Sequence, residues 1–151
     1  MNANENCIAY AGHLKAEHRE LHQRLRALQA ELNQVAFPRI DEPLLARMIE
    51  RGQRLADEIA AHFCEELDGG CLDYAVSRVP GLAAEARTLE AEHSALLAEL
   101  DSMLKELRAA RPEQLELAQI KRRFDAFVVR LLSHESRENR VVERGFNMPL
   151  D

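Results

Sequence analysis

The sequence predicts an all-α protein, an antiparallel up-down-up-down four-helix bundle formed by one domain over residues 1–151. Two observations support this prediction. Only 6 Gly and 5 Pro interrupt a chain rich in Ala, Leu, Glu, Arg and Gln, and this composition favours long helices. Apolar residues recur at helical spacing along four long stretches, and no segment alternates with a period of two over the length of a strand.

The first predicted helix covers residues 8–33. Its leucines recur at spacings of 7, 4, 3 and 4, which places them on one helix face. They are Leu14, Leu21, Leu25, Leu28 and Leu32. Pro38 cannot continue a helix, so residues 34–42 are expected to form a linker.

The second predicted helix, residues 43–67, begins near Pro43, because proline is well tolerated in the first turn of a helix. Gly69 and Gly70 interrupt the pattern, and capping this helix is their simplest role. A short helical piece over residues 71–78 follows, and a Val-Pro-Gly sequence ends it.

The third predicted helix covers residues 82–109 and the fourth covers residues 113–145, with a tight turn at Pro112 between them. Both helices keep an apolar stripe. It includes Leu89, Leu96, Leu100 and Leu104 in the third helix and Phe124, Phe127 and Leu131 in the fourth. Because the connections are short, four such helices fold most simply with consecutive helices in opposite directions.

Composition excludes several classes of partner. The formal net charge of −6 argues against nucleic acid, which requires a basic face. The sequence contains no run of 18 apolar residues, which a membrane-spanning helix would need. The N-terminal residues lack the basic segment and apolar stretch of a signal peptide, so we expect a cytoplasmic protein.

The three cysteines of the chain include no CxxC pair, so we expect reduced thiols and no cysteine-based zinc site.

Two histidines are followed one helical turn later by a glutamate, His62 by Glu66 and His134 by Glu138. Residues four apart lie on the same helix face, so each pair can direct an imidazole and a carboxylate to one point. One such pair is weak evidence, because 26 of the 151 residues are acidic and an exposed ion pair is the simpler explanation of it.

The level of the histidines along the bundle is more informative. In an antiparallel bundle, the connections after the first and third helices lie at the same end. Four histidines lie roughly 22–32 Å from that end at about 1.5 Å per residue. They are His18, His62, His93 and His134, one from each helix. Each of them continues the apolar stripe of its helix, so all four are expected to point inward.

Glu66 and Glu138 lie one turn further along and enter the adjacent layer together. A single buried histidine is explained most simply by a neighbouring polar group that satisfies it. Six buried polar side chains in two layers would be costly unless something satisfied all of them, and a metal pair would do so. We therefore predict a dinuclear site with bridging carboxylates. Imidazole and carboxylate ligands suit iron, and also Mn or Zn.

This pattern resembles the hemerythrin-like family, also called HHE cation-binding domains. The resemblance spans nearly the whole chain and rests on the segments AEHRELHQRL, HFCEELDGG, LEAEHSALLAEL and LLSHESREN. It implies a hemerythrin-like bundle with two irons bridged by Glu66, Glu138 and an oxo or hydroxo group, and with the four histidines as terminal ligands. It also implies an open coordination position at the metal pair. This position would bind dioxygen reversibly or let the site sense oxygen, nitric oxide, peroxide or iron.

The sequence departs from oxygen-carrying hemerythrins in one respect. Those proteins have a HxxxH pair on the third helix, whereas here leucines lie four residues before and after His93. One terminal imidazole is therefore missing. His22, Glu65, Glu92 or water could fill the position. The missing ligand weakens the oxygen-carrier interpretation and favours a sensor, a redox role or looser metal binding.

The leading interpretation is a non-haem diiron protein that binds or senses a small ligand (dioxygen, nitric oxide or peroxide) or cellular iron or redox state. One alternative is a diiron enzyme that reduces peroxide or nitric oxide. Others are a bundle with a structural metal only and an interaction module without metal. The chain has His-x-x-x-Glu rather than the Glu-x-x-His pairs of ferritin-type bundles, so ferroxidase chemistry is not favoured. A signalling role would need a separate partner, and a homodimer is compatible with the sequence.

Five further residues fall near the expected site. Cys64 is expected to pack in the core or an interface, and Cys71 to be an inert thiol rather than a redox reporter. Tyr10 and Tyr74 are expected to pack as ordinary amphipathic rings, with hydrogen bonding or ligation at the site as the alternative. His13 is expected to be exposed or to contact a metal-ligating residue.

Overall fold

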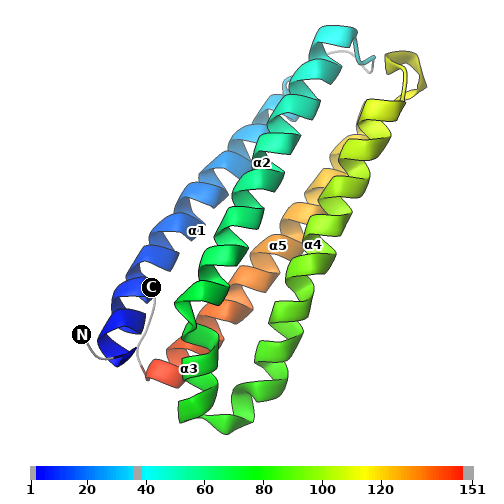
Figure 1. The fold of residues 1–151 in the computed structure, drawn as a ribbon. Coiled ribbons are helices and arrows are strands. Elements are labelled where there is room, and N and C mark those ends of the chain that lie inside the picture. The colour runs from blue at the N-terminus through cyan, green and yellow to red at the C-terminus, as the bar shows by residue number, and fades with distance from the viewer. Residues whose placement is uncertain (1–2, 36–38, 148–151) are drawn as a thin grey trace.

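The computed structural model describes residues 3–35 and 39–147, and in this part of the chain all regular structure is helical. Four long helices lie side by side (Figure 1). They are α1 (Ala3–Asn33), α2 (Glu42–Gly69), α4 (Ala83–Ala109) and α5 (Leu117–Phe146). A short helix, α3 (Cys71–Arg78), follows α2, and two 3-10 turns, η1 (Pro80–Leu82) and η2 (Pro112–Gln114), precede α4 and α5. The predicted helical bundle is confirmed.

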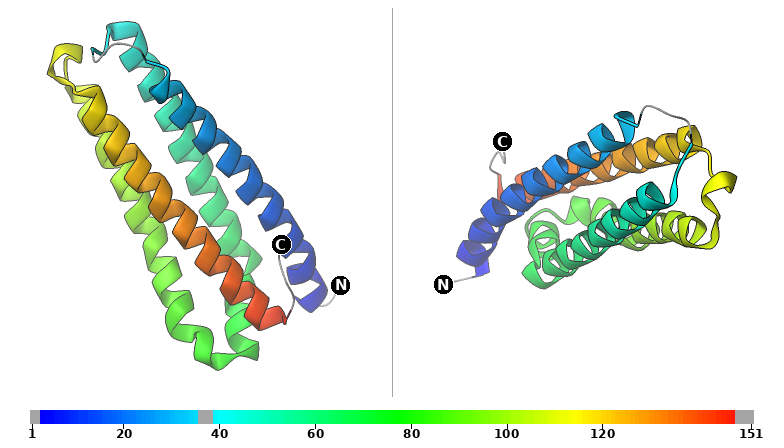
Figure 2. Two further views of the ribbon diagram at one scale, coloured as in Figure 1. Left: turned by 180° about the vertical axis from the view of Figure 1, so that it is seen from behind. Right: turned by 90° about the horizontal axis from the view of Figure 1, so that it is seen from above.

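The connections lie at the two ends of the bundle. The link from α1 to α2 and the η2 turn lie at one end, and α3 lies at the other (Figure 1). Viewed from behind, α5 returns between α4 and α1 (Figure 2), and it contacts both. None of the described helices is long and apolar enough to cross a membrane.

The second helix has a sharply defined start and end. The side chain of Asp41 accepts a hydrogen bond of 2.8 Å from the backbone N–H of Leu44, which satisfies a free donor of the first turn. At the other end Gly70 adopts a left-handed conformation with φ 64°, which glycine adopts without steric cost. The predicted capping role of the glycine pair is therefore confirmed at Gly70.

Two predicted helix starts were wrong. The first helix begins at Ala3 rather than near residue 8. The last begins at Leu117 rather than at Glu113. Leu115 and Glu116 are extended, because the segment Pro112–Gln114 closes its own short turn, in which Gln114 accepts a hydrogen bond of 2.9 Å from the backbone of Arg111. Of the predicted linker 34–42, residues 36–38 lie outside the described residues.

The apolar interior is divided into two clusters. The larger cluster fills the bundle from the end of η2 to Phe63 and Leu131, and the smaller one joins α3 to Leu89 and Val142. Between these clusters lies a layer of buried polar side chains. Its members are His18, His62, Glu66, His93, His134, Glu135 and Glu138. The two apolar clusters therefore exclude water from this layer from above and below.

Candidate metal centre

The six residues selected from the sequence come together in one cluster, which we call the His/Glu cluster. Its members are His18 on α1, His62 and Glu66 on α2, His93 on α4, and His134 and Glu138 on α5. All six are buried, with at most 7% of their surface exposed. The imidazoles and carboxylates of four helices therefore meet in the interior of the bundle, as the count along each helix predicted.

One half of the cluster contains His18, His62 and Glu66, whose ligand atoms lie within 4.8 Å of one another. The Nε2 atoms of His18 and His62 are 3.0 Å apart. Oε1 of Glu66 lies 2.5 Å from Nε2 of His62 and 3.5 Å from Nε2 of His18. Two nitrogens bound at about 2.1 Å and a right angle to one ion lie about 3 Å apart, so this spacing suits a shared cation.

The other half contains Glu66, His93, His134 and Glu138, again with ligand atoms within 4.8 Å of one another. Nε2 of His93 lies 3.2 Å from Oε2 of Glu66 and 3.5 Å from Oε2 of Glu138. Nε2 of His134 lies 3.3 Å from Oε1 of Glu138. Glu66 thus presents one oxygen to each half, and Glu138 Oε1 also lies 3.9 Å from Nε2 of His18.

The far nitrogens of two histidines are held by carboxylates. Nδ1 of His62 donates to Oε2 of Glu17 at 2.8 Å, and Nδ1 of His134 donates to Oε2 of Glu92 at 2.7 Å. Glu92 also accepts hydrogen bonds of 2.7 and 2.8 Å from Arg137. Such contacts fix the ring orientation and leave Nε2 free to bind a metal, an arrangement typical of metal-ligating histidines.

The two halves of the chain repeat one pattern. Glu17 directly precedes His18 and contacts the histidine of the following long helix, and Glu92 directly precedes His93 and does the same. Each of those histidines is followed by a glutamate one helical turn later. The α1–α2 pair and the α4–α5 pair therefore contribute equivalent sets of groups, which sequence reasoning had not recognised.

Electrostatics in the cluster follow from burial and close contact. Burial alone would lower the pKa of His62 and His93, but the contacts with Glu66, together with Glu17 or Glu138, outweigh it and raise both to about 9. Burial would raise the pKa of Glu66, but the contacts with His18, His62 and His93 lower it. Without a metal, protons on the imidazoles therefore balance the buried carboxylates.

The buried polar atoms offer a direct test of whether a metal fits. Within the described residues, eight buried side-chain atoms lack a hydrogen-bond partner, and all belong to the His/Glu cluster or to Glu135. Both oxygens of Glu66 and the Nε2 atoms of His93 and His134 are among them. These atoms approach one another without the alignment of hydrogen bonds. Such convergence is expected around cations, and leaving these atoms unpaired would be costly.

Glu135, which sequence reasoning missed, is also buried beside the cluster, with 2% of its surface exposed. Its Oε2 contacts Nε2 of His22, and its Oε1 has no hydrogen-bond partner. Burial raises the pKa of the Glu135 carboxyl to about 8, with smaller and opposing effects of His62 and the neighbouring glutamates. The sequence signal that could have identified Glu135 is its position directly after His134, which continues an inward-facing stripe.

The three side chains that could fill the missing helix-3 position each contact another residue. His22 is half-exposed and pairs with Glu135. Glu92 is engaged by His134 and Arg137. Glu65 is exposed and lies 3.6 Å from His13. None of the three belongs to either group of converging ligand atoms.

Three further predictions can be compared with the structure. Cys64 is exposed, so the core position was wrong, because the residue lies off the inward face of α2, and packing in an interface stays a prediction. Cys71 is buried, as an inert thiol would be. Tyr74 stacks on Phe146 with ring centroids 5.0 Å apart, which is ordinary packing. The side chain of Tyr10 lies outside the described residues.

His13 is largely exposed and contacts Glu17 at 3.1 Å, so it touches a residue that orients His62. A small recess of about 10 Å³ adjoins the cluster between α2, α3 and α4. Its walls include Glu66, His93, Gly70 and Leu72. This volume is about the least that holds one water molecule, so the recess admits one very small molecule.

Comparison of the chain with protein-family models, with curated proteins and with solved structures finds no match.

Proposed function

We propose that this protein is a non-haem diiron protein of the hemerythrin-like kind, with an up-down-up-down bundle that binds or senses a small ligand. The observation that carries the proposal is the convergence of four buried imidazoles and two buried carboxylates, among which both oxygens of Glu66 and the Nε2 atoms of His93 and His134 lack hydrogen-bond partners. The resemblance of the sequence pattern to the hemerythrin-like family supports the same conclusion. A cytoplasmic location and a separate signalling partner or homodimer belong to the proposal as well.

The ligand set divides between two ions. His18 and His62 would hold one ion, and His93 and His134 would hold the other. Glu66 offers one oxygen to each half and would bridge them, and Glu138 lies within reach of both halves. Iron is favoured over Mn or Zn by the hemerythrin-like pattern, since the donor types suit all three.

A bound iron pair would supply reversible electron transfer and an affinity for diatomic molecules and peroxide. The protein's own residues determine the conditions at the site. Glu17 and Glu92 hold the rings of His62 and His134 in place. The apolar clusters on both sides exclude bulk water. The recess beside Glu66 and His93 limits access to molecules of about the size of water.

The test is the metal content and the optical spectrum of the full chain, produced with iron supplementation and purified with and without oxygen. We expect two irons per chain and a spectrum that changes when dioxygen, nitric oxide or peroxide is added. Zinc alone, or no metal after iron supplementation, would contradict the proposal. Two irons with a spectrum unaffected by every small ligand would favour the alternative of a structural metal.

A measurement of turnover distinguishes a diiron enzyme from a protein that only binds or senses the small ligand. Catalytic consumption of peroxide or nitric oxide, with the iron retained over many cycles, would make the protein a diiron enzyme. Stoichiometric binding without consumption supports the binding or sensing role.

A further inference from the structure

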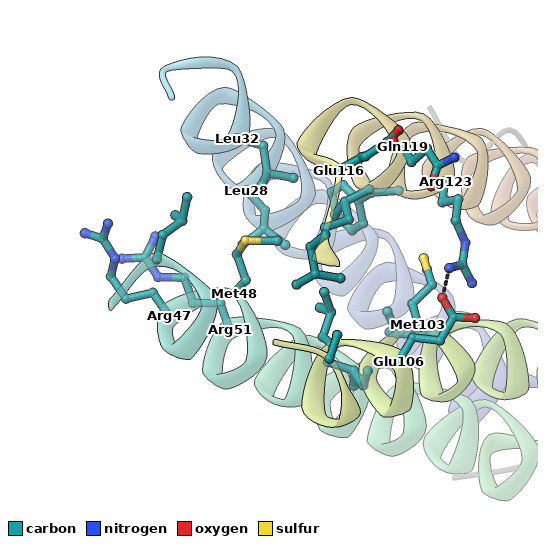
Figure 3. Close-up of a pocket in the computed structure, with 18 of the residues that line it drawn as sticks. Leu28, Leu32, Arg47, Met48, Arg51, Met103, Glu106, Glu116, Gln119 and Arg123 are labelled. Atoms are coloured by element: carbon teal, nitrogen blue, oxygen red, sulfur yellow. Dashed lines mark hydrogen bonds and ion pairs between the residues drawn. The ribbon is translucent and has the colours of Figure 1, made fainter. Parts of the chain in front are cut away.

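A second internal space lies at the opposite end of the bundle from the His/Glu cluster. It is a cavity of about 470 Å³, bounded by all four long helices and by the segment from Ala109 to Glu116 (Figure 3). This volume falls within the range of about 300–1,000 Å³ that is typical of small-molecule sites. The space is partly open to solvent and has room for a small apolar molecule.

The walls of the cavity are apolar. Leu32, Leu104 and Phe124 contribute buried side chains from three different helices. Met48 and Met103 line it from α2 and α4, and methionine side chains adapt readily to the shape of an apolar ligand. The interior therefore suits an unbranched hydrocarbon chain and offers it no polar partner of its own.

The charged groups of the cavity stand at its edge. Arg51 pairs with Glu31, and Arg123 pairs with Glu106. Arg47, one turn before Arg51 on α2, makes no ion pair or hydrogen bond with any of the residues that the structure describes. Figure 3 shows Arg47 and Arg51 together on one side of the cavity.

Glu116, the remaining acidic residue of the lining, lies on the far side with Gln119 (Figure 3). The α2 side of the mouth therefore carries two guanidinium groups and a single neutralising carboxylate. In a chain of net charge −6, this local excess of positive charge suits an anionic group at the mouth.

We propose that this cavity binds a single-chain anionic amphiphile of the fatty-acid type, with its hydrocarbon chain among the helices and its carboxylate at Arg47. Arginine forms charge-assisted hydrogen bonds with carboxylates and commonly does so in pairs of parallel bonds. The cavity lies outside the proposed metal centre, so the inference stands independently of metal binding.

The test is a calorimetric titration of the full-length protein with straight-chain carboxylates from about six to about sixteen carbons, kept below the concentrations at which they aggregate. We expect one molecule per chain and an affinity that rises about fourfold per methylene until the cavity is full. Alcohols of the same chain length measure the contribution of the charge, and they are expected to bind more weakly.

Two classes of variant locate the ligand. R47Q is expected to weaken carboxylate binding about threefold to tenfold and to leave alcohol binding unchanged. R87Q, which removes an exposed charge of α4 outside the cavity, is the matched control. M103F fills part of the cavity and should shorten the chain length at which affinity stops rising, and M48F does so from another wall. Circular dichroism establishes that each variant is folded.

The outcomes decide the proposal. Absence of saturable binding, or binding that neither folded methionine variant alters, would refute the cavity as the site. Equal binding of alcohols and carboxylates, unaffected by R47Q, would also overturn the proposal, because the ligand would then be a neutral apolar compound. A chain-length limit that both methionine variants shorten, together with a carboxylate preference lost in R47Q alone, supports it.

Discussion

Oε2 of Glu92 lies 2.7 Å from Nδ1 of His134 and links α4 to α5 directly behind the His/Glu cluster. Because this contact fixes the ring, E92A is expected to weaken metal binding at the His134 half of the cluster about 10- to 100-fold. E92Q should have a smaller effect, since the amide oxygen still accepts the hydrogen bond. A metal titration followed by absorbance measures both variants.

The control for this prediction is D101A, which removes an exposed carboxylate from the same helix. Its metal affinity should match that of the unmodified protein. If E92A and D101A bind metal equally well, Glu92 has no orienting role.

Removal of the shared carboxylate is expected to have the largest effect. Glu66 contacts both halves of the cluster, so E66A should abolish binding of the metal pair. H18A removes a donor from one half only and should retain one ion more readily. Metal analysis after gel filtration measures the number of ions that each variant holds. Retention of two ions by E66A would contradict the bridging assignment.

The stability of the metal-free protein is expected to fall as the pH rises. His62 and His93 have pKa values of about 9 in the folded chain, above the usual 6.5, so the stability that they contribute is complete below pH 6.5 and is lost as the pH rises through 9. Glu135, with a pKa of about 8 against a usual 4.5, loses its contribution from pH 4.5 to 8. The free energy of unfolding in urea should therefore be several kcal/mol lower at pH 9 than at pH 6.

Two comparisons make the pH prediction specific. E135Q cannot ionise, so it should reduce the fall in stability between pH 6 and pH 8. Bound metal replaces the protons on the imidazoles, so the loaded protein should show a smaller dependence on pH. A metal-free protein that is as stable at pH 9 as at pH 6 would show that the histidines do not carry these protons.

Close contact between Gly145 on α5 and Ala75 on α3 predicts a steric effect. A Cβ atom at position 145 would lie 2.3 Å from Cβ and 2.4 Å from Cα of Ala75, where the backbone cannot easily yield. G145A is therefore expected to lower the free energy of unfolding by about 1–3 kcal/mol. Thermal or urea unfolding, followed by circular dichroism, provides the measurement.

Gly12 offers a matched control on α1, because a Cβ atom there would meet nothing within 4 Å. G12A should raise stability by roughly 0.5–1 kcal/mol, since alanine favours a helix more than glycine. Equal stability of the two alanine variants would show that α3 can move away from α5 at little cost.

The sequence predicted the bodies of the helices better than their ends. Leucine spacing defines an inward face over many turns, so Leu21, Leu25 and Leu32 were placed in the core correctly. A helix end depends on a few local hydrogen bonds. The Asp41 cap and the extended residues at Leu115 and Glu116 depend on backbone angles that apolar periodicity does not encode.

In the site, too, some features could be predicted from residue spacing and others could not. Helical geometry brings His18, His62 and His93 to one layer whatever their rotamers, so spacing alone could predict their convergence. Glu17 and Glu135 lie next to inward-facing histidines, about 100° round the helix, where a side chain can meet a neighbouring helix or solvent. Which of these it meets depends on the distance between helices and on rotamers, and the sequence pattern contains neither.

The position of Glu66 between the two halves of the cluster has a consequence for metal uptake. The first ion to bind would order the carboxylate that the second ion also requires, and it would displace protons that oppose both. The two binding events are then linked, and by reciprocity each favours the other. Uptake should be cooperative, with a sigmoidal titration and few half-loaded molecules, so the protein would switch between empty and fully loaded forms over a narrow range of metal concentration.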